Sequence, residues 1–307
     1  MEIAKKGIER ELTEKTRIAQ FKDVEIHIVY GAEAPRTLEE IGRIREREYR
    51  VVGAGRGDEL DLDAYDTTPP AYAQLVSWDP DEREIVALYR AIHCGWALEN
   101  RGVEALRTHQ LFEFGTEFAS TILPRAVELG RSVVNSSAKR AIQGLFSVWV
   151  GLGAMVREWP DIEYFFGNVS LYRSLPESAV AGILSYLYDY HAAPSGLVSA
   201  HEPSPAWPRD RRRADSAQPR EEAFAELERK AATEGWLFPP ILLTYLKACP
   251  GLLAFDAAVD PDFGEAIEVA IAVPIAELTK KTVARFITPY RSTNTHAFSR
   301  VGRARVS

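Results

Sequence analysis

A short apolar stretch, residues 127–134 (VELGRSVV), contains three side chains suited to acid–base or anion chemistry: Glu128, Arg131 and Ser132. The rest of the stretch is apolar enough for a central β-strand, where a buried charge needs a physical reason. Strict alternation would place Glu128 and Arg131 on opposite faces, whereas a bulge at Gly130 would bring them to the same face. Two interpretations stay open. Either the two residues form a buried ion pair, or Glu128 is a desolvated general base with a raised pKa.

A second cluster of charges, Asp61, Asp63 and Asp66, lies in the segment DLDAYD. The spacing begins like a calcium loop, but the sixth position is Asp66 instead of glycine and the twelfth is Tyr72 instead of glutamate. The cluster is therefore either a solvated acidic turn or a group of carboxylates that receives a cationic part of a substrate. The six histidines show no HxH or HxxxH spacing and the two cysteines lie far apart, so we expect no metal site.

The elements that position these residues are predicted in the order strand, helix, hairpin, then strand–turn–helix–strand–helix. Residues 24–30 alternate apolar and polar side chains, which predicts a strand, and residues 37–51 form a helix with Thr37 as its N-cap. Glycines 53, 55 and 57 are predicted to end that helix. They are not predicted to form a dinucleotide-binding loop, because Asp58 stands where that loop needs its third glycine. Further strands are predicted at residues 72–78, 85–92, 126–134, 162–171, 252–259 and 267–273, and further helices at residues 141–158, 176–190 and 221–234.

The domain organisation follows from shifts in composition along the chain. We expect one domain over residues 23–290, preceded by an N-terminal helical leader over residues 1–22. A Pro- and Arg-rich segment at about 192–220 is predicted to be an inserted, solvent-exposed linker, and the final strands at about 252–273 are assigned to the same sheet. Residues 291–307 are predicted to be a flexible basic tail, whose arginines are either solvated or available to an acidic carrier protein or an anionic lipid.

Composition excludes several classes of protein. The chain has 307 residues, of which 46% are hydrophobic and 26% charged, so a folded core is expected and wholesale disorder is not. A net charge of −7 argues against a nucleic-acid binder. The first residues lack the apolar core of a secretion signal and the longest apolar run, residues 144–156, is too short for a bilayer. We expect a cytoplasmic protein, with peripheral contact at the inner face of the membrane as an open option.

Several separated motifs, in the same order and with similar spacing, resemble one family. The chain is similar to the acyl-carrier-protein-dependent N-acyltransferases of the GNAT superfamily that are often labelled haemolysin-like and are related to ornithine-lipid and glycine-lipid synthases. The resemblance covers about residues 37–273. The motifs are REREYRVVG at residues 45–53, DLDAYD at 61–66, IVALYR at 85–90, ELGRS at 128–132, LFSVWVG at 145–151, YFFGNVS at 164–170 and VDPDF at 259–263.

The resemblance implies a fold and an activity. The fold would be α/β (α+β), GNAT-like, with a mixed, mostly antiparallel central sheet flanked by helices on both faces. The reaction would move a long, often 3-hydroxylated acyl chain from acyl carrier protein to the amine of an amino acid, a step in aminolipid synthesis. It needs no metal and no permanently bound cofactor, because the donor is an acyl-phosphopantetheine thioester. Coenzyme A is the less favoured carrier, since the turn at residues 135–140 lacks the glycines of a pyrophosphate loop.

Two other functions are kept as alternatives. The first is a non-catalytic GNAT-like module that binds acyl carrier protein or lipid, and the second is a synthase of the acyl-homoserine-lactone type, which would need S-adenosylmethionine. A panel of acceptors separates all three. No feature of the sequence favours the second alternative.

The resemblance also assigns candidate site residues. Glu128 would be the base that deprotonates the acceptor ammonium, and either Arg131 or Arg90 would hold the acceptor carboxylate. The phosphate of the donor would approach the start of the helix that follows the strand, where free N–H groups and the helix dipole favour an anion. The reaction centre would be lined by Arg90, Glu128, Arg131 and Ser132, the acceptor side by Asp61, Asp63, Asp66 and Asn168, and the phosphate seat by Asn135, Ser136, Ser137, Lys139 and Arg140.

Overall fold

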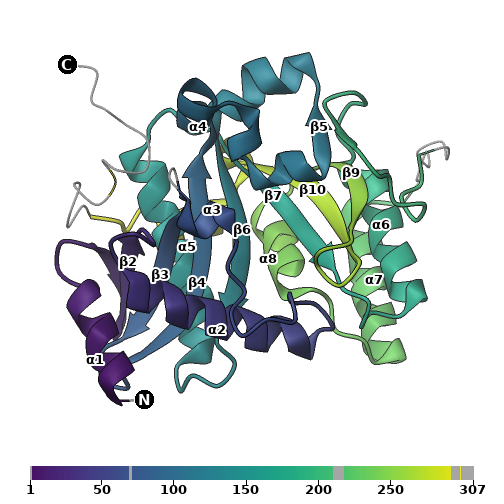
Figure 1. Cartoon of the computed structure of the whole chain (residues 1–307). Coiled ribbons are helices and arrows are strands. Elements are labelled where there is room, and N and C mark those ends of the chain that lie inside the picture. Colours follow the sequence, from purple (N-terminus) through teal and green to yellow (C-terminus); the bar gives the residue numbers. More distant parts are fainter. Residues whose placement is uncertain (1, 69–70, 210–217, 292–297, 299–307) are drawn as a thin grey trace.

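The computed structural model describes residues 2–68, 71–209, 218–291 and 298 (Figure 1). The strands are β1 (Arg17–Phe21), β2 (Val24–Val29), β3 (Ala73–Asp79), β4 (Glu84–His93), β5 (Phe112–Phe114), β6 (Ala126–Val134), β7 (Tyr164–Leu171), β8 (Val198–Ala200), β9 (Leu253–Asp260) and β10 (Ala266–Pro274). The helices are α1 (Glu2–Glu11), α2 (Pro35–Val51), α3 (Ala64–Thr67), α4 (Cys94–Arg101), α5 (Ala141–Glu158), α6 (Glu177–His191), α7 (Arg220–Glu234), α8 (Pro240–Ala248) and α9 (Lys280–Thr282).

Eight of the strands form one sheet in the order β1-β2-β3-β4-β6-β7-β10-β9, and β5 and β8 form a separate pair. Every neighbouring pair in the large sheet is antiparallel except β6 and β7, which are parallel. One core cluster packs α5, α6, α7 and α8 on one face of the sheet, and two others pack α1, α2 and α4 on the other face. The expected mixed, mostly antiparallel sheet with helices on both faces is confirmed.

The helix α5 covers the sheet as its apolar pattern predicts. Val148, Trp149 and Leu152 are buried against the strands and form its packing face. Leu145, one turn earlier, borders a cavity instead. No described helix is long and apolar enough to cross a membrane.

The N-terminal segment differs from its prediction. A helix was expected through the first twenty residues; it is confirmed for α1 and wrong for β1, which pairs with β2 and buries Ile18 completely. The last residue of α1 caps the start of α2, because the Glu11 carboxylate accepts hydrogen bonds from the backbone N–H groups of Arg36 and Thr37. Thr37 is therefore not the N-cap of α2, which begins at Pro35.

The segment at 192–220 is more ordered than predicted up to residue 209. Strand β8 lies within it, Trp207 is 5% exposed, and Ala192 and Pro203 form bridges to β9. The linker prediction is wrong for this part, and residues 210–217 lie outside the described residues. Of the predicted tail at 291–307, the structure describes residues 291 and 298 only; Phe298 packs edge-on against Trp159.

The strand β6 has a bulge, one of the two geometries that the sequence left open. Its pairing with β4 shifts between Val133, opposite Leu88, and Gly130, opposite Arg90, so β6 holds one extra residue there. Arg131, inside the bulge, has a φ of 54°, a left-handed conformation that is uncommon for a residue with a side chain. Arg131 consequently faces the same side of the sheet as Glu128.

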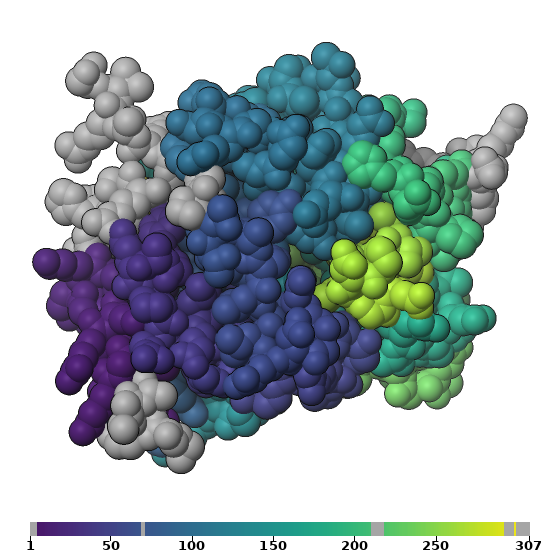
Figure 2. Space-filling model, in the orientation of Figure 1, coloured from purple at the N-terminus to yellow at the C-terminus, as the bar shows by residue number. Residues whose placement is uncertain are grey.

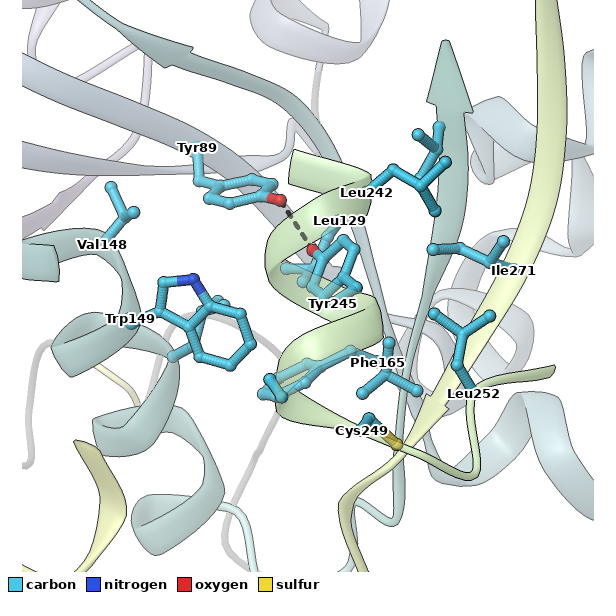
Figure 3. Close-up of a cluster of buried hydrophobic side chains, with 14 of the residues drawn as sticks. Tyr89, Leu129, Val148, Trp149, Phe165, Leu242, Tyr245, Cys249, Leu252 and Ile271 are labelled. Carbon is cyan, nitrogen blue, oxygen red and sulfur yellow. Dashed lines mark hydrogen bonds between the residues drawn. The ribbon is translucent and has the colours of Figure 1, made fainter. Parts of the chain in front are cut away.

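The parallel pair β6–β7 separates where the bulge begins. Their pairing runs from Ala126 opposite Tyr164 to Leu129 opposite Gly167 and stops there, although both strands continue. The helix α8, which the sequence prediction missed, lies behind this gap. Figure 3 shows Tyr245 of α8 facing Tyr89 of β4, with their hydroxyl oxygens 2.6 Å apart. The splayed strands and α8 therefore frame an opening within the sheet.

The opposite face is covered by α2 and the loops after it. Figure 2 shows this segment, in dark blue, running across the face until it meets the turn between β9 and β10, in yellow-green. The two touch closely, because a Cβ placed on Gly264 in that turn would lie 2.5 Å from the carbonyl oxygen of Gly53. Residues far apart in the sequence thus close over one end of the splay.

Candidate active site

A cavity of about 370 Å³ occupies the gap between β6 and β7. It is lined from both faces of the sheet, with polar groups on the α2 side and apolar groups on the α5 and α8 side. The polar part includes Arg90, Arg107, Glu128, Arg131, Asn168, Ser170, Asp260 and Glu268. The apolar part includes Leu145, Phe165, Pro240, Ile241, Ile271 and Val273.

The acidic cluster pairs with arginines of this chain. Asp66 accepts two hydrogen bonds of 3.0 Å from Arg45, and Asp63 accepts two of 2.9 Å from Arg90. Asp61 lies 2.9 Å from Nε of Arg131. Because Asp61 and Asp66 are 1% and 0% exposed, the prediction of a solvated acidic turn is wrong.

The cluster also differs from a site for a cationic substrate group, because its charges are already compensated. The neighbouring guanidinium groups of Arg45 and Arg90 lower the pKa of Asp66, and the carboxylates raise the pKa of Arg90 in turn. Asp63 and Asp66 additionally form a capping box that starts α3. We conclude that the cluster is a rigid support for Arg90 and Arg131, which line the cavity.

Glu128 lies at the cavity wall, 2% exposed. Its Oε1 accepts hydrogen bonds of 2.7 Å from the backbone N–H and from the hydroxyl of Thr108, and its Oε2 accepts one of 2.8 Å from the hydroxyl of Tyr72. Burial raises the pKa of Glu128, and the three donors act against that rise.

The predicted Glu128–Arg131 ion pair is not formed among the described residues. Arg131 binds Asp61 instead, and its guanidinium carbon lies 4.4 Å from the ring centre of Phe263 and 5.6 Å from that of Tyr49. Ring contact of this kind stabilises the cation in addition to the ion pair. Of the two interpretations, the ion pair is wrong, and the role of Glu128 as a base stays a prediction.

A second buried carboxylate, Glu268, was missed by the sequence analysis. It lies on β10 opposite Ser170 of β7, is 5% exposed, and accepts a hydrogen bond of 2.6 Å from the Ser170 hydroxyl. Burial, together with the nearby negative charge of Asp260, raises its pKa to about 7. The same signal that singles out Glu128, a carboxylate inside an apolar strand, would have found Glu268 in residues 266–274.

Arg107, also missed, enters the cavity from a short turn after α4. Its Nη2 donates to Asp260 at 2.7 Å, while its buried Nη1 has no hydrogen-bond partner among the described residues. Asn168 on β7 is similar, since its buried Oδ1 has no partner within the same part of the chain. Both groups line the cavity, so both are available to a bound molecule.

The predicted phosphate seat at residues 135–140 does not border the cavity. Lys139 is ion-paired with Glu82, and Arg140 with Asp79 and Asp81. The amide of Asn135 is used inside the fold, where it donates to the carbonyl of Ile85 at 2.7 Å. The structure therefore brings Arg90, Glu128, Arg131, Ser132 and Asn168 to the cavity but leaves this group outside it.

Carboxylates accept hydrogen bonds from backbone N–H groups in the turn before α5. The N–H of Ser136 donates to Glu48 at 3.3 Å, and the N–H of Lys139 donates to Glu84 at 2.8 Å. No cluster of His, Cys, Asp or Glu that could hold a metal is found within the described ranges.

The chain is similar to known acyltransferases in sequence. A family model described as an acetyltransferase (GNAT) domain matches residues 44–149. The chain is 30% identical over 296 residues to a protein of Bacteroides thetaiotaomicron named glycine N(alpha)-acyltransferase, an alignment that covers 93% of this chain and 88% of that protein. A protein of Phocaeicola vulgatus with the same name is 29% identical over 297 residues, covering 93% of this chain and 91% of its own length.

Two solved structures also align with the chain. The CoA-dependent acyl-homoserine lactone synthase MesI aligns over 86% of this chain and 94% of its own, with a TM-score of 0.36 and 13% identity. The acyl-homoserine lactone synthase LasI aligns over 48% of this chain and 72% of its own, with a TM-score of 0.33 and 16% identity.

Proposed function

The chain is an acyltransferase of the GNAT family to which the two glycine N(alpha)-acyltransferases belong, and on this premise we propose that it acylates the amine of a small amino acid with a long acyl chain. Glycine is the first acceptor to test, because both relatives are named for it. The donor in this proposal is the thioester of an acyl carrier protein. The product would be an N-acyl amino acid, a precursor of an aminolipid.

The observation that carries the proposal is a cavity with two chemically different ends inside one sheet. Its polar end presents cationic and carboxylate groups suited to a zwitterion, including Arg107 and Glu268. Its apolar end, between α5 and α8, suits hydrocarbon, since it is lined by side chains such as Leu145 and Ile241. A reaction that joins a small amino acid to a long acyl chain needs these two surroundings next to each other.

The chemistry requires a base and a place for the leaving thiol. An amino acid enters mainly as an ammonium at neutral pH, so a proton must leave before the nitrogen can attack the thioester carbonyl. Backbone groups of β6 beyond Leu129 are not paired with β7, and we propose that an N–H there stabilises the oxyanion. The hydroxyls of Tyr89 and Tyr245 share one hydrogen bond, which leaves one proton to meet the departing sulfur.

The charge distribution in the turn before α5 supports acyl carrier protein over coenzyme A as donor. Coenzyme A would bring several phosphate charges to a turn whose N–H groups of Ser136 and Lys139 already bind Glu48 and Glu84. A single phosphodiester needs to displace only one carboxylate, for example Glu48 from the N–H of Ser136. We keep this turn as the proposed phosphate seat, with Lys139 and Arg140, each ion-paired within the chain, as its nearby cations.

The test is a direct assay of the purified chain with 3-hydroxypalmitoyl acyl carrier protein, the matching acyl-coenzyme A, and a pool of amino acids. Freed thiol and product mass are measured together. The proposal predicts thiol release with the carrier protein and a product whose mass names the acceptor. Binding of the carrier protein without release of thiol for any acceptor would refute it and support a non-catalytic binding module.

A further inference from the structure

Two buried glutamates line the cavity, Glu128 and Glu268, and they differ in how many donors hold them. Resting on the proposed function, we propose that Glu268 is the catalytic base that takes the proton of the acceptor ammonium, and that Glu128 is a positioning residue. Arg107, next to Glu268, would hold the acceptor carboxylate. The proposal follows from the contacts of each group.

Glu128 is committed to the protein. Two of its donors come from Thr108 and the third from Tyr72. The backbone N–H of Arg107 donates to the Tyr72 oxygen at 2.8 Å, so the proton of Tyr72 points to Glu128. Burial raises the pKa of Glu128, and the three donors act against that rise because they favour the charged form. Protonating the carboxylate would break this arrangement. Glu128 thereby fixes the turn that carries Arg107.

Glu268 has the opposite character. Its one side-chain donor in the described structure is the hydroxyl of Ser170, and no Lys or Arg of that structure lies within ion-pair distance of it. It lines the cavity and is 5% exposed. An incoming ammonium would supply the missing counter-charge, and the pKa of about 7 allows Glu268 to accept a proton near neutral pH.

Arg107 completes a site for a zwitterion. The Asp260 carboxylate binds one end of its guanidinium, and this leaves Nη1 buried and without a partner among the residues described. Arg107 and Glu268 influence each other electrostatically, which places them in one neighbourhood. A carboxylate on Nη1 and an ammonium at Glu268 would orient a small amino acid by both of its charged ends.

The ammonium gives one proton to the Glu268 carboxylate, and its nitrogen electron pair then attacks the thioester carbon. The new C–N bond forms as the C–S bond breaks and the electron pair leaves with sulfur. A hydroxyl of the Tyr89–Tyr245 pair gives its proton to that thiolate and takes up the second proton lost from nitrogen. Free thiol and amide result, and Glu268 returns its proton to water.

The charged and titratable groups around Glu268 determine how its proton affinity can be changed. Asp260 of β9 raises the pKa, whereas the Ser170 hydroxyl of β7, Arg107 and Arg131 of β6 lower it. Burial raises the pKa of Tyr172, and the negative charge of Glu268 adds to that rise. Replacing Ser170 by alanine should therefore move the titration of Glu268 to higher pH without removing the carboxylate.

The experiment measures kcat/KM for the acceptor from pH 5 to 9 with saturating acyl carrier protein thioester. Wild type should gain activity with pH, with a midpoint near 7. Glu268→Gln should lose about 100-fold or more in kcat/KM and lose this rise, because general base catalysis contributes on that order. Ser170→Ala should move the midpoint upward. Glu128→Gln should lower the rate but keep the midpoint of wild type.

The control is Glu163→Gln, which changes an exposed carboxylate paired with Arg125 outside the cavity and should leave the profile unchanged. The inference is overturned if Glu128→Gln loses the rise with pH while Glu268→Gln retains it. It is also overturned if Ser170→Ala leaves the midpoint unmoved, a readout that holds even if Glu268→Gln does not fold. Failure of the proposed function is distinguishable, because the unmutated chain would then show no turnover with any acceptor.

Discussion

Replacing Glu268 by glutamine should stabilise the fold at alkaline pH while it removes turnover. The pKa of this carboxyl rises from 4.5 to about 7 on folding. The folded state thus prefers the protonated acid, so its contribution to stability is present below pH 4.5 and is lost as the pH rises through about 7. Each pKa unit corresponds to about 1.4 kcal/mol, so the ionised carboxylate lowers the free energy of unfolding by about 3 kcal/mol at pH 8.

Glutamine retains the shape and an acceptor for the Ser170 hydroxyl but does not ionise. We therefore expect Glu268→Gln to exceed wild type in stability by up to about 3 kcal/mol at pH 8, and by about 1 kcal/mol or less at pH 5. The assay is urea unfolding followed by tryptophan fluorescence at both values of pH, with Glu163→Gln as the exposed control. An equal difference in stability at pH 5 and pH 8 would refute the reasoning.

Two other substitutions test the splay and its support. Gly167→Ala places a Cβ 2.3 Å from the carbonyl oxygen of Leu129 at a φ of 154°. We expect it to lower the free energy of unfolding in urea by about 3 kcal/mol. The control Gly182→Ala, whose Cβ meets only a leucine methyl at 3.2 Å, should cost far less. Arg45→Met removes one of the two arginines that hold buried Asp66 and should lower the free energy of unfolding by about 3–5 kcal/mol, measured by the same method; a loss under 1 kcal/mol would show that the network is not a support.

The parts of the fold that the sequence predicted are those with long or regular hydrophobic patterns. The unit from β6 through α6 is confirmed because a nine-residue apolar strand and an eighteen-residue apolar helix leave little ambiguity. Short elements were missed. Strand β1 has five residues and continues the spacing of a preceding helix, and α8 has nine residues between two prolines and a turn. Local patterns of that length do not separate helix, strand and loop.

Site residues were predicted where a charged side chain and the apolar residues that make it unusual lie in the same segment. Glu128 and Arg131 stood out as charges within an apolar strand, and both line the cavity. Arg107 did not, since its partner Asp260 is 153 residues away and only the closed sheet brings them together. The acidic cluster was recognised, but its partner Arg45 was not. Arg45 lies in a helix with many other charged residues, and the sequence does not show that this one is buried.

The bulge in β6 changes the parity of the strand. Before it, even-numbered residues such as Glu128 face the polar side; after it, odd-numbered residues such as Val133 do. Strand β7 keeps one parity throughout, with Phe165, Val169 and Leu171 on the α5 side and Phe166 on the other side. Two parallel neighbours that fall out of phase cannot continue one hydrogen-bond ladder, so a single inserted residue is enough to open the gap. Deleting one residue at Arg131 would bring the strands back into phase. We then expect the pairing of β6 with β7 to continue beyond Leu129 and Gly167, which would close the opening in the sheet.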